Sequence, residues 1–261
     1  MPRWGLIALI TAGLIVPACG GGGGGGEGAP DDTAATAMSD SPAGGHGDEE
    51  EEQPISTRAQ DADRDEGEQP QQVMDRLGIE AGDHVADIVA GGGYYTYLLA
   101  ERVGPDGMVY ATGAEGVSRR MAEGDLAGRS NIRVVEGLGD VPAGTLDAVL
   151  VNRAYHLLNA PNGPFFSDLR RALAPDGVVG VIEVRLGSPT GHDMETHRMG
   201  EETVKGEMQA GGFQLVESSD LLANAEDPHT DFMEGRRHLA DRMFLIFRKA
   251  DEGAQGTAGA D

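Results

Sequence analysis

The chain has 261 residues and a formal net charge of −24. Residues 1–70 hold 14 acids against 3 bases, whereas residues 71–250 hold 27 acids against 17 bases. The central part contains no basic stripe and no Lys/Arg-rich helix, which argues against a nucleic-acid partner. Its length, about 180 residues, corresponds to one domain.

The first nineteen residues have the organisation of an export signal. Arg3 supplies the basic start, and the apolar segment over 4–16 is shorter than the ~20 residues that a membrane span needs. The sequence then reads VPAC, which ordinary signal cleavage would also accept. Because the only cysteine of the chain, Cys19, follows this site, the segment resembles a bacterial lipobox. We therefore expect residues 1–19 to be a lipoprotein signal peptide, with a lipid on Cys19 that anchors an exported protein to the periplasmic side of a bacterial membrane, the outer membrane.

Residues 20–69 have the composition of a disordered tether. Seven glycines occupy 20–26, an acidic block occupies 48–52, and apolar residues are scarce. Such a segment buries too little apolar surface to offset the entropy of ordering it. We expect a flexible spacer that spans roughly 40 Å, and a second disordered tail over 251–261.

From residue 70 to residue 250, apolar patterns typical of strands and helices alternate along the chain. Strands are expected over 84–89, 108–112, 132–135, 146–151, 178–184, 213–217 and 242–248, and helices over 70–77, 94–103, 117–126, 165–173 and 201–210. Alternation of this kind predicts an α/β fold, a doubly wound sheet with helices on both faces. The connection between the last two strands has no helix that ends directly at the second strand, so a reversed last strand is plausible.

The most informative segment is VADIVAGGGYYT, residues 85–96. A short apolar strand carrying Asp87 breaks into three glycines and resumes as a helix. Glycines allow close approach of the backbone to a ligand, and the first turn of a helix offers N–H groups to a polar group. The turn alone suggests an adenosine-type ligand and does not distinguish dinucleotide enzymes from methyltransferases.

Further segments resolve that ambiguity by their likeness to a known family. They read GIEAGDHVADIVAGGGYYT (78–96), GPDGMVYATGAE (104–115), LDAVLVNRAYHLL (146–158), LRRALAPDGVVGVIEV (169–184), VKGEMQAGGFQLVESSDLL (204–222) and DRMFLIFRKA (241–250). Over roughly residues 70–249 the chain resembles the class I S-adenosylmethionine-dependent methyltransferases, and most of all predicted methyltransferases among bacterial exported proteins and lipoproteins. The resemblance implies a Rossmann-like sheet of about seven strands whose last strand is antiparallel and lies beside the fifth.

The family pattern also assigns the cofactor site for S-adenosylmethionine. It places Asp87 near the amino group of the methionine part and makes Ala90, Gly91 and Gly93 the loop under the carboxylate and ribose. Asn152 follows strand four, at the edge of the sheet where ligands bind.

Two positions depart from that pattern. Val89 stands where the family has its first glycine, and a β-branched side chain resists positive φ. Gly113 stands where an acid would grip the ribose hydroxyls. Glu115 could reach back to that place, and Asp140 stands near the position that usually contacts the adenine amino group.

Two residues after strand four are candidates for the catalytic site. His156 could act as a base and Tyr155 could orient a small-molecule methyl acceptor, but the simpler interpretation is that both pack under the following loop. Glu183 could face the pocket or end its strand at the surface.

Other polar groups have weaker claims. His192, Asp193 and His197 lie in a polar loop that could be a lid, and their spacing fits no metal-binding helical face, so no metal is expected. No serine lies in a nucleophile elbow. The sequence thus favours a membrane-tethered methyltransferase; the alternatives are a non-catalytic binding lipoprotein with the same fold and, less strongly, a nicotinamide oxidoreductase.

Overall fold

The chain divides into two units, residues 1–51 and residues 52–261, and the second unit is compact. The computed structural model describes residues 56–233 and 236–250, all in the second unit. The expected signal peptide, Cys19, most of the expected tether and the expected tail over 251–261 lie outside the described residues. Within the described part, every helix is too short or too polar to cross a membrane.

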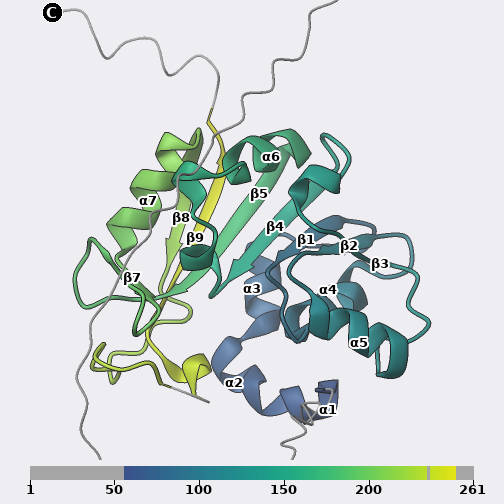
Figure 1. Ribbon diagram of the computed structural model, residues 1–261, viewed down its shortest axis with the longest axis horizontal. Coiled ribbons are helices and arrows are strands. Elements are labelled where there is room, and N and C mark those ends of the chain that lie inside the picture. Colours follow the sequence, from purple (N-terminus) through teal and green to yellow (C-terminus); the bar gives the residue numbers. More distant parts are fainter. Residues whose placement is uncertain (1–55, 234–235, 251–261) are drawn as a thin grey trace, which may run out of the picture. The chain divides into compact units, whose positions relative to one another are not determined.

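Seven strands form one mixed sheet in the order β3-β2-β1-β4-β5-β9-β8 (Figure 1). They are β1 His84–Ile88, β2 Met108–Ala111, β3 Ile132–Val134, β4 Leu146–Asn152, β5 Leu173–Val184, β8 Phe213–Ser219 and β9 Arg242–Lys249. The last strand, β9, is antiparallel to both of its neighbours, β5 and β8. The predicted fold class, the number of strands and the reversed last strand beside the fifth are confirmed.

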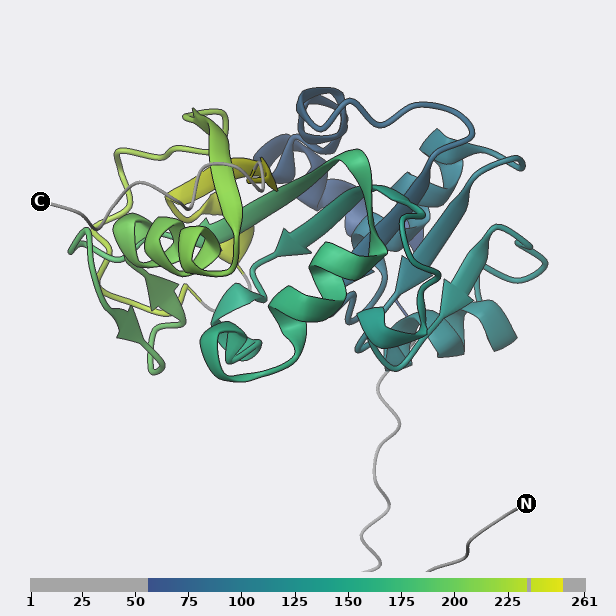
Figure 2. The same ribbon diagram turned by 90° about the horizontal axis from the view of Figure 1, so that it is seen from above.

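Helices cover both faces of this sheet. The helices α3 (Pro70–Arg76), α4 (Tyr94–Val103) and α5 (Glu115–Glu123) pack in one core, and α6 (Phe165–Ala172) and α7 (Glu201–Ala210) pack in the other. Figure 2 shows the green helices α6 and α7 along the same side of the sheet. Alternate strand residues supply the two cores, as the two-residue period of a strand requires: Val85 joins the first and Ala86 the second.

The domain begins earlier than the sequence indicates. Residues expected in the tether form α1 (Arg58–Asp61), the 3-10 helix η1 (Ala62–Arg64) and α2 (Asp65–Glu68), which lie beside α3 and α4 in Figure 1. The expected boundary at residue 70 is therefore wrong. The inward-facing stripe of this segment is charged rather than apolar, because Asp61 is 7% exposed and Glu68 0% exposed. Hydrophobic periodicity cannot detect such a stripe.

Glu68 connects three distant parts of the chain. Its carboxylate meets the guanidinium groups of Arg64 at 3.2 Å, Arg153 at 3.1 Å and Arg242 at 2.7 Å. Arg242 begins β9 and Arg153 follows β4, so one carboxylate fixes the N-terminal helices to the edge of the sheet. Burial opposes its ionisation, but the three arginines outweigh burial and hold the pKa of Glu68 below its usual value.

Two connections also differ from expectation. The segment 174–177, which separates the expected helix over 165–173 from the expected strand over 178–184, lies inside the long strand β5, where the register with β4 shifts between Leu146 and Ala148. The polar loop after β5 contains a small antiparallel ribbon, β6 (His192–Asp193) with β7 (Arg198–Met199). Neither feature has a hydrophobic period long enough to appear in the sequence.

Replacing Glu68 with Gln should strongly destabilise the domain. Removing one partner of a buried ion pair leaves uncompensated charges and costs about 3–5 kcal/mol of unfolding free energy. Urea unfolding measures the loss, with Glu66→Gln, an exposed acid of the same helix, as the control. A Glu68→Gln protein within about 1 kcal/mol of the parent would contradict this role.

Candidate functional site

The glycine turn after β1 is held against the end of β2 by backbone hydrogen bonds. The N–H of Ala90 donates to the carbonyl of Thr112 at 2.8 Å, and the N–H of Gly91 donates to that of Gly113 at 3.1 Å. Gly93 caps α4 with φ +82°, and a Cβ there would lie 2.8 Å from Val117 Cγ2. Gly93 thus permits the turn to pack against α5.

Val89 and Gly113 are matched to each other across this turn. Val89 has φ +54°, a left-handed conformation that a β-branched residue adopts only under constraint. Its N–H donates to Thr112 Oγ1 at 3.0 Å. A Cβ at Gly113 would lie 3.2 Å from Val89 Cα and 3.4 Å from its Cγ1, and Gly113 itself has φ +52°. An acid at position 113 would therefore crowd Val89, so the two departures from the family pattern belong together.

A pocket of about 240 Å³ opens at the turn. It is lined by Arg64, Asp87, Val89, Ala90, Gly91, Gly92, Tyr94, Tyr95, Asn152 and Arg153. We call it the glycine-turn pocket. Its volume is below the ~300–1,000 Å³ of whole small-molecule sites, so it matches one part of a cofactor. Four of the residues predicted to bind the cofactor, Asp87, Ala90, Gly91 and Asn152, come together here.

Asp87 is a buried carboxylate at the end of β1. It is 3% exposed, and its Oδ2 accepts a hydrogen bond from Thr96 Oγ1 at 2.6 Å. Burial raises its pKa to about 6, opposed by hydrogen bonds from Thr96 and by the charge of Arg64. An acid that faces a pocket with so little compensation favours a ligand that brings positive charge or hydrogen-bond donors.

Two arginines line the pocket that were not predicted from the sequence. Arg64 comes from η1, and its guanidinium carbon lies 4.0 Å from the centre of the Tyr94 ring. Arg153 directly follows β4, with φ +53°. Beside it, Asn152 Oδ1 is buried and accepts no hydrogen bond from the described residues. The ion pairs of both arginines with Glu68 hold them at the pocket.

The remaining predicted cofactor residues lie outside this pocket. Gly93 packs against α5, as described above. Glu115 is exposed at the first turn of α5, and Asp140 is exposed in a 3-10 turn, Leu138–Asp140, where its Oδ2 accepts a hydrogen bond from Gly137 N at 3.4 Å. Their assignments to ribose and adenine stay predictions.

The predicted catalytic residues line a different pocket, of about 300 Å³, which we call the histidine pocket. Tyr155 is 2% exposed and packs edge-on against Phe165. Both ring nitrogens of His156 are engaged: Nδ1 lies 2.9 Å from Glu183 Oε2, and Nε2 lies 2.9 Å from His197 Nδ1. A base role for His156 would require the contact with His197 to open.

Glu183 points inward and not to the surface. It is 0% exposed, and its other oxygen accepts the N–H of Val184 at 3.0 Å. The ring of His197 lies between the rings of His156 and Phe232, with centres 4.9 Å from each. The loop expected to be a polar lid therefore packs on the sheet edge. Across the described residues, no group of three or more His, Cys, Asp or Glu side chains is placed to hold a metal ion.

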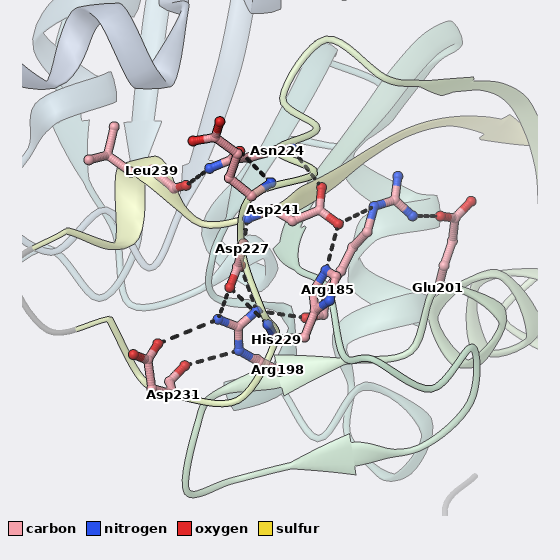
Figure 3. Close-up of polar contacts among 10 residues, drawn as sticks. Arg185, Arg198, Glu201, Asn224, Asp227, His229, Asp231, Leu239 and Asp241 are labelled. Carbon is pink, nitrogen blue, oxygen red and sulfur yellow. Dashed lines mark hydrogen bonds and ion pairs between the residues drawn. The ribbon is translucent and has the colours of Figure 1, made fainter.

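A buried polar network fixes the long loop between β8 and β9 (Figure 3). Arg198 is 0% exposed and forms a two-pronged pair with Asp227 at 2.9 and 3.0 Å. Asp241 accepts from His229 Nε2 at 2.8 Å and lies 3.6 Å from Arg185. Burial opposes ionisation of Asp227, but Arg198 and backbone N–H groups hold its pKa below the usual value. These residues anchor the loop and lie outside both pockets.

Comparison of the sequence with models of protein families gives no match, and comparison with curated proteins gives none either. Solved structures do match. A SAM-dependent methyltransferase from Aquifex aeolicus has a TM-score of 0.54 and 20% identity, covering 70% of this chain and 90% of its own. The 1,6-didemethyltoxoflavin-N1-methyltransferase of Burkholderia thailandensis, solved with S-adenosylhomocysteine, has a TM-score of 0.51 and 16% identity, covering 74% of this chain and 80% of its own.

This is the fold of the class I methyltransferases. The cyclase SpnF shares the fold, with a TM-score of 0.53 and 18% identity over 70% of this chain and 81% of its own. A methyltransferase fold therefore does not by itself determine which reaction a protein catalyses, and the reaction must be inferred from the residues of the site.

The glycine-turn pocket of this methyltransferase fold suits one end of S-adenosylmethionine. The buried Asp87 carboxylate and the unpartnered Asn152 Oδ1 can accept from an ammonium, and Arg64 and Arg153 complement a carboxylate. The amino-acid end of the cofactor carries both groups. The nucleoside end finds no second carboxylate among the lining residues.

Asp87→Asn should stabilise the protein near neutral pH and lose that advantage in acid. Because burial raises the pKa of Asp87 from 3.8 to about 6, the folded state binds more protons than the unfolded state between these values. Its contribution to unfolding free energy therefore falls as pH rises through that window, by up to about 3 kcal/mol. Asn retains an acceptor for Thr96 and removes the buried charge.

Urea unfolding at about pH 7.5 and about pH 4.5 tests this, with the exposed Asp106→Asn as the control. We expect Asp87→Asn to exceed the parent in stability only at the higher pH. An equal change in unfolding free energy at both pH values would show that burial does not raise the pKa of Asp87.

Proposed function

We propose that the protein is an S-adenosylmethionine-dependent methyltransferase for a small molecule, exported and anchored to a membrane by a lipid on Cys19. The observation that carries the catalytic part is the pairing of a methyltransferase fold with a buried, poorly compensated Asp87 beside the glycine turn. That carboxylate, at the end of β1, is suited to an ammonium ligand.

The donor would bind across the carboxyl edge of the sheet. Asp87 and Asn152 Oδ1 would accept the hydrogen bonds of its ammonium, and Arg64 and Arg153 would face its carboxylate. When bound, the cofactor supplies an activated methyl group on a sulfonium. The residues of this chain bind and orient it and keep water out, which is most of what direct displacement asks of an enzyme.

One observation favours a second candidate, a non-catalytic ligand-binding protein with this fold. Val89 occupies the side of the turn where an acid at position 113 would stand, so the usual grip on a ribose is absent from that place. Glu115 and Asp140, the two candidates to replace it, are exposed and outside the pocket. A weakened nucleoside site would turn a methyltransferase into a binding protein.

The proposed location rests on the N-terminal sequence. The basic start, the short apolar segment and the VPAC motif are those of an exported lipoprotein, and the glycine-rich and acidic segment that follows would hold the domain away from the membrane. The neighbour that methylates 1,6-didemethyltoxoflavin supports a small-molecule acceptor. A nucleic-acid acceptor finds no basic surface in the composition.

Calorimetry with S-adenosylmethionine and S-adenosylhomocysteine tests the catalytic proposal, on residues 52–261, the compact unit. We expect binding of both, and at least a tenfold weakening by Asp87→Ala, about 1.4 kcal/mol or more. Asp106→Asn is the matched control. If neither ligand binds at about millimolar concentration, which corresponds to a binding free energy of about −4 kcal/mol, the enzyme proposal is refuted and the binding-protein candidate remains.

Glu115→Ala, measured in the same series, tests the ribose assignment. A measurable loss of affinity would place Glu115 at the ligand. An unchanged affinity would remove Glu115 from the site without affecting the donor proposal.

Mass spectrometry of the mature N-terminus tests the anchor. Processing before Cys19 should leave a lipidated cysteine as the first residue, and Cys19→Ser should abolish both the added mass and membrane retention. An unmodified Cys19 in the exported protein would refute lipidation.

A further inference from the structure

The histidine pocket differs from the glycine-turn pocket in charge. Its lining residues include no Lys or Arg, and its single formal charge is the carboxylate of Glu207, on α7. Within the described residues, Glu207 forms no ion pair. A carboxylate with no cationic partner at a pocket favours a ligand that brings a positive charge or N–H donors.

A buried hydroxyl lies beside that carboxylate. Tyr155 OH is buried and makes no hydrogen bond of ordinary geometry among the described residues. Burial first, and then the Glu207 carboxylate, raises the pKa of Tyr155, so the hydroxyl keeps its proton. The hydroxyl thus faces the Glu207 carboxylate without an ordinary hydrogen bond, and such a pair on a cavity marks a place where a ligand or a water completes the hydrogen bonding.

The mouth of the same pocket is apolar. Leu157 is 51% exposed and Met194 is 54% exposed, and both line it. They come from separate segments, the 3-10 turn after β4 and the ribbon β6–β7. Met199 and Pro161 extend the apolar wall. Large exposed apolar side chains that gather on one cavity from different segments indicate a binding site for an apolar group.

His156 supports this wall and does not compete for the ligand. Its two ring nitrogens are engaged by Glu183 and His197, so the ring lines the pocket with carbon atoms and no available hydrogen-bonding nitrogen. The pocket therefore combines an apolar wall with a polar corner formed by Tyr155 OH and Glu207, and its remaining polar lining is neutral: Asn159, Asn162 and His192.

We propose that the histidine pocket binds a small apolar amine, with its nitrogen at Glu207 and Tyr155 and its apolar body against Leu157 and Met194. Arg153, which lines the glycine-turn pocket, is two residues from Tyr155, and two residues span at most about 7 Å. The two pockets thus share the chain segment after β4. The role of the amine as methyl acceptor rests on the proposed function; its binding does not.

In that role the bound ammonium first loses one proton to water, and the resulting neutral amine attacks the methyl carbon. The N–C bond forms from the nitrogen lone pair, the S–C bond breaks with its electron pair left on sulfur, and the positive charge passes from sulfur to nitrogen. The Glu207 carboxylate would stabilise that charge where it develops.

Three probes with one ring and different charge test the proposal: benzylamine, benzyl alcohol and benzoate. Titrated into the purified protein and followed by NMR, benzylamine should shift the signals of the Met194 methyl and the His192 ring, and should bind about tenfold more tightly than benzoate. Glu207→Gln should weaken benzylamine about tenfold, toward the affinity of benzyl alcohol. Glu202→Gln, an exposed acid on the same helix, should have no effect.

Met194→Ser provides a second variant at a side chain that is 54% exposed, and should weaken all three probes alike. Equal binding of benzylamine and benzoate, no benzylamine binding at about 10 mM, or an unchanged affinity in Glu207→Gln would overturn the proposal. Calorimetry with S-adenosylhomocysteine on the same samples separates the two claims. Donor binding without amine binding refutes the amine site alone, and amine binding without donor binding supports the amine site while refuting the methyltransferase.

Discussion

The buried carboxylate of Glu68 is the contact on which the candidate donor site depends. Three guanidinium groups, from η1, from the loop after β4 and from the start of β9, meet it. Two of them, Arg64 and Arg153, then face the glycine-turn pocket. Because a buried carboxylate is costly unless it is paired, the N-terminal helices must dock for the pocket wall to exist. Folding of residues 56–69 and formation of the site are therefore one event.

The two pockets differ in the charged groups that line them. The glycine-turn pocket combines Asp87 with two arginines and so complements a ligand with charges of both signs. The histidine pocket has one carboxylate beside a buried hydroxyl, and an apolar mouth. The amino-acid end of S-adenosylmethionine carries charges of both signs, and a methyl acceptor must lie beside the donor, so this difference in charge between neighbouring pockets suits the two ligands. The matched pair of Val89 and Gly113 is the feature that most weakens the case for donor binding, because this pair leaves the nucleoside part of the donor without its usual acid.

Hydrophobic periodicity predicted most of the fold, since the central strands and the long helices bury apolar side chains. Helices α4 and α7 have the predicted limits, and β9 lies where the resemblance placed it. Hydrophobic periodicity gave a wrong prediction where the buried side chains are charged. Asp61 and Glu68 look like tether residues in the sequence. Arg64 lies close to both, but the other partners that make their burial favourable, such as Arg120 and Arg242, are more than fifty residues away. No local pattern contains that information.

The site was predictable only where it follows from the turn itself. Asp87, Gly91 and Asn152 meet because parallel strands end at one edge of a sheet. Arg153 was missed because nothing in the sequence relates it to Glu68. Arg64 lies four residues before Glu68, and it was missed because the segment was expected to be part of the tether. His156 was predicted to be a base because it follows β4, at the edge of the sheet where ligands bind. The residues that engage its ring nitrogens, Glu183 and His197, come from other segments, so the sequence does not indicate that these nitrogens are occupied.

A crystal structure with S-adenosylhomocysteine tests the central claim most directly, because it locates each end of the ligand. The account predicts the amino group within hydrogen-bond distance of Asp87 or Asn152 Oδ1, and the carboxylate toward Arg64 and Arg153. A ligand bound elsewhere, or bound in reverse with its adenine at Asp87, would contradict it.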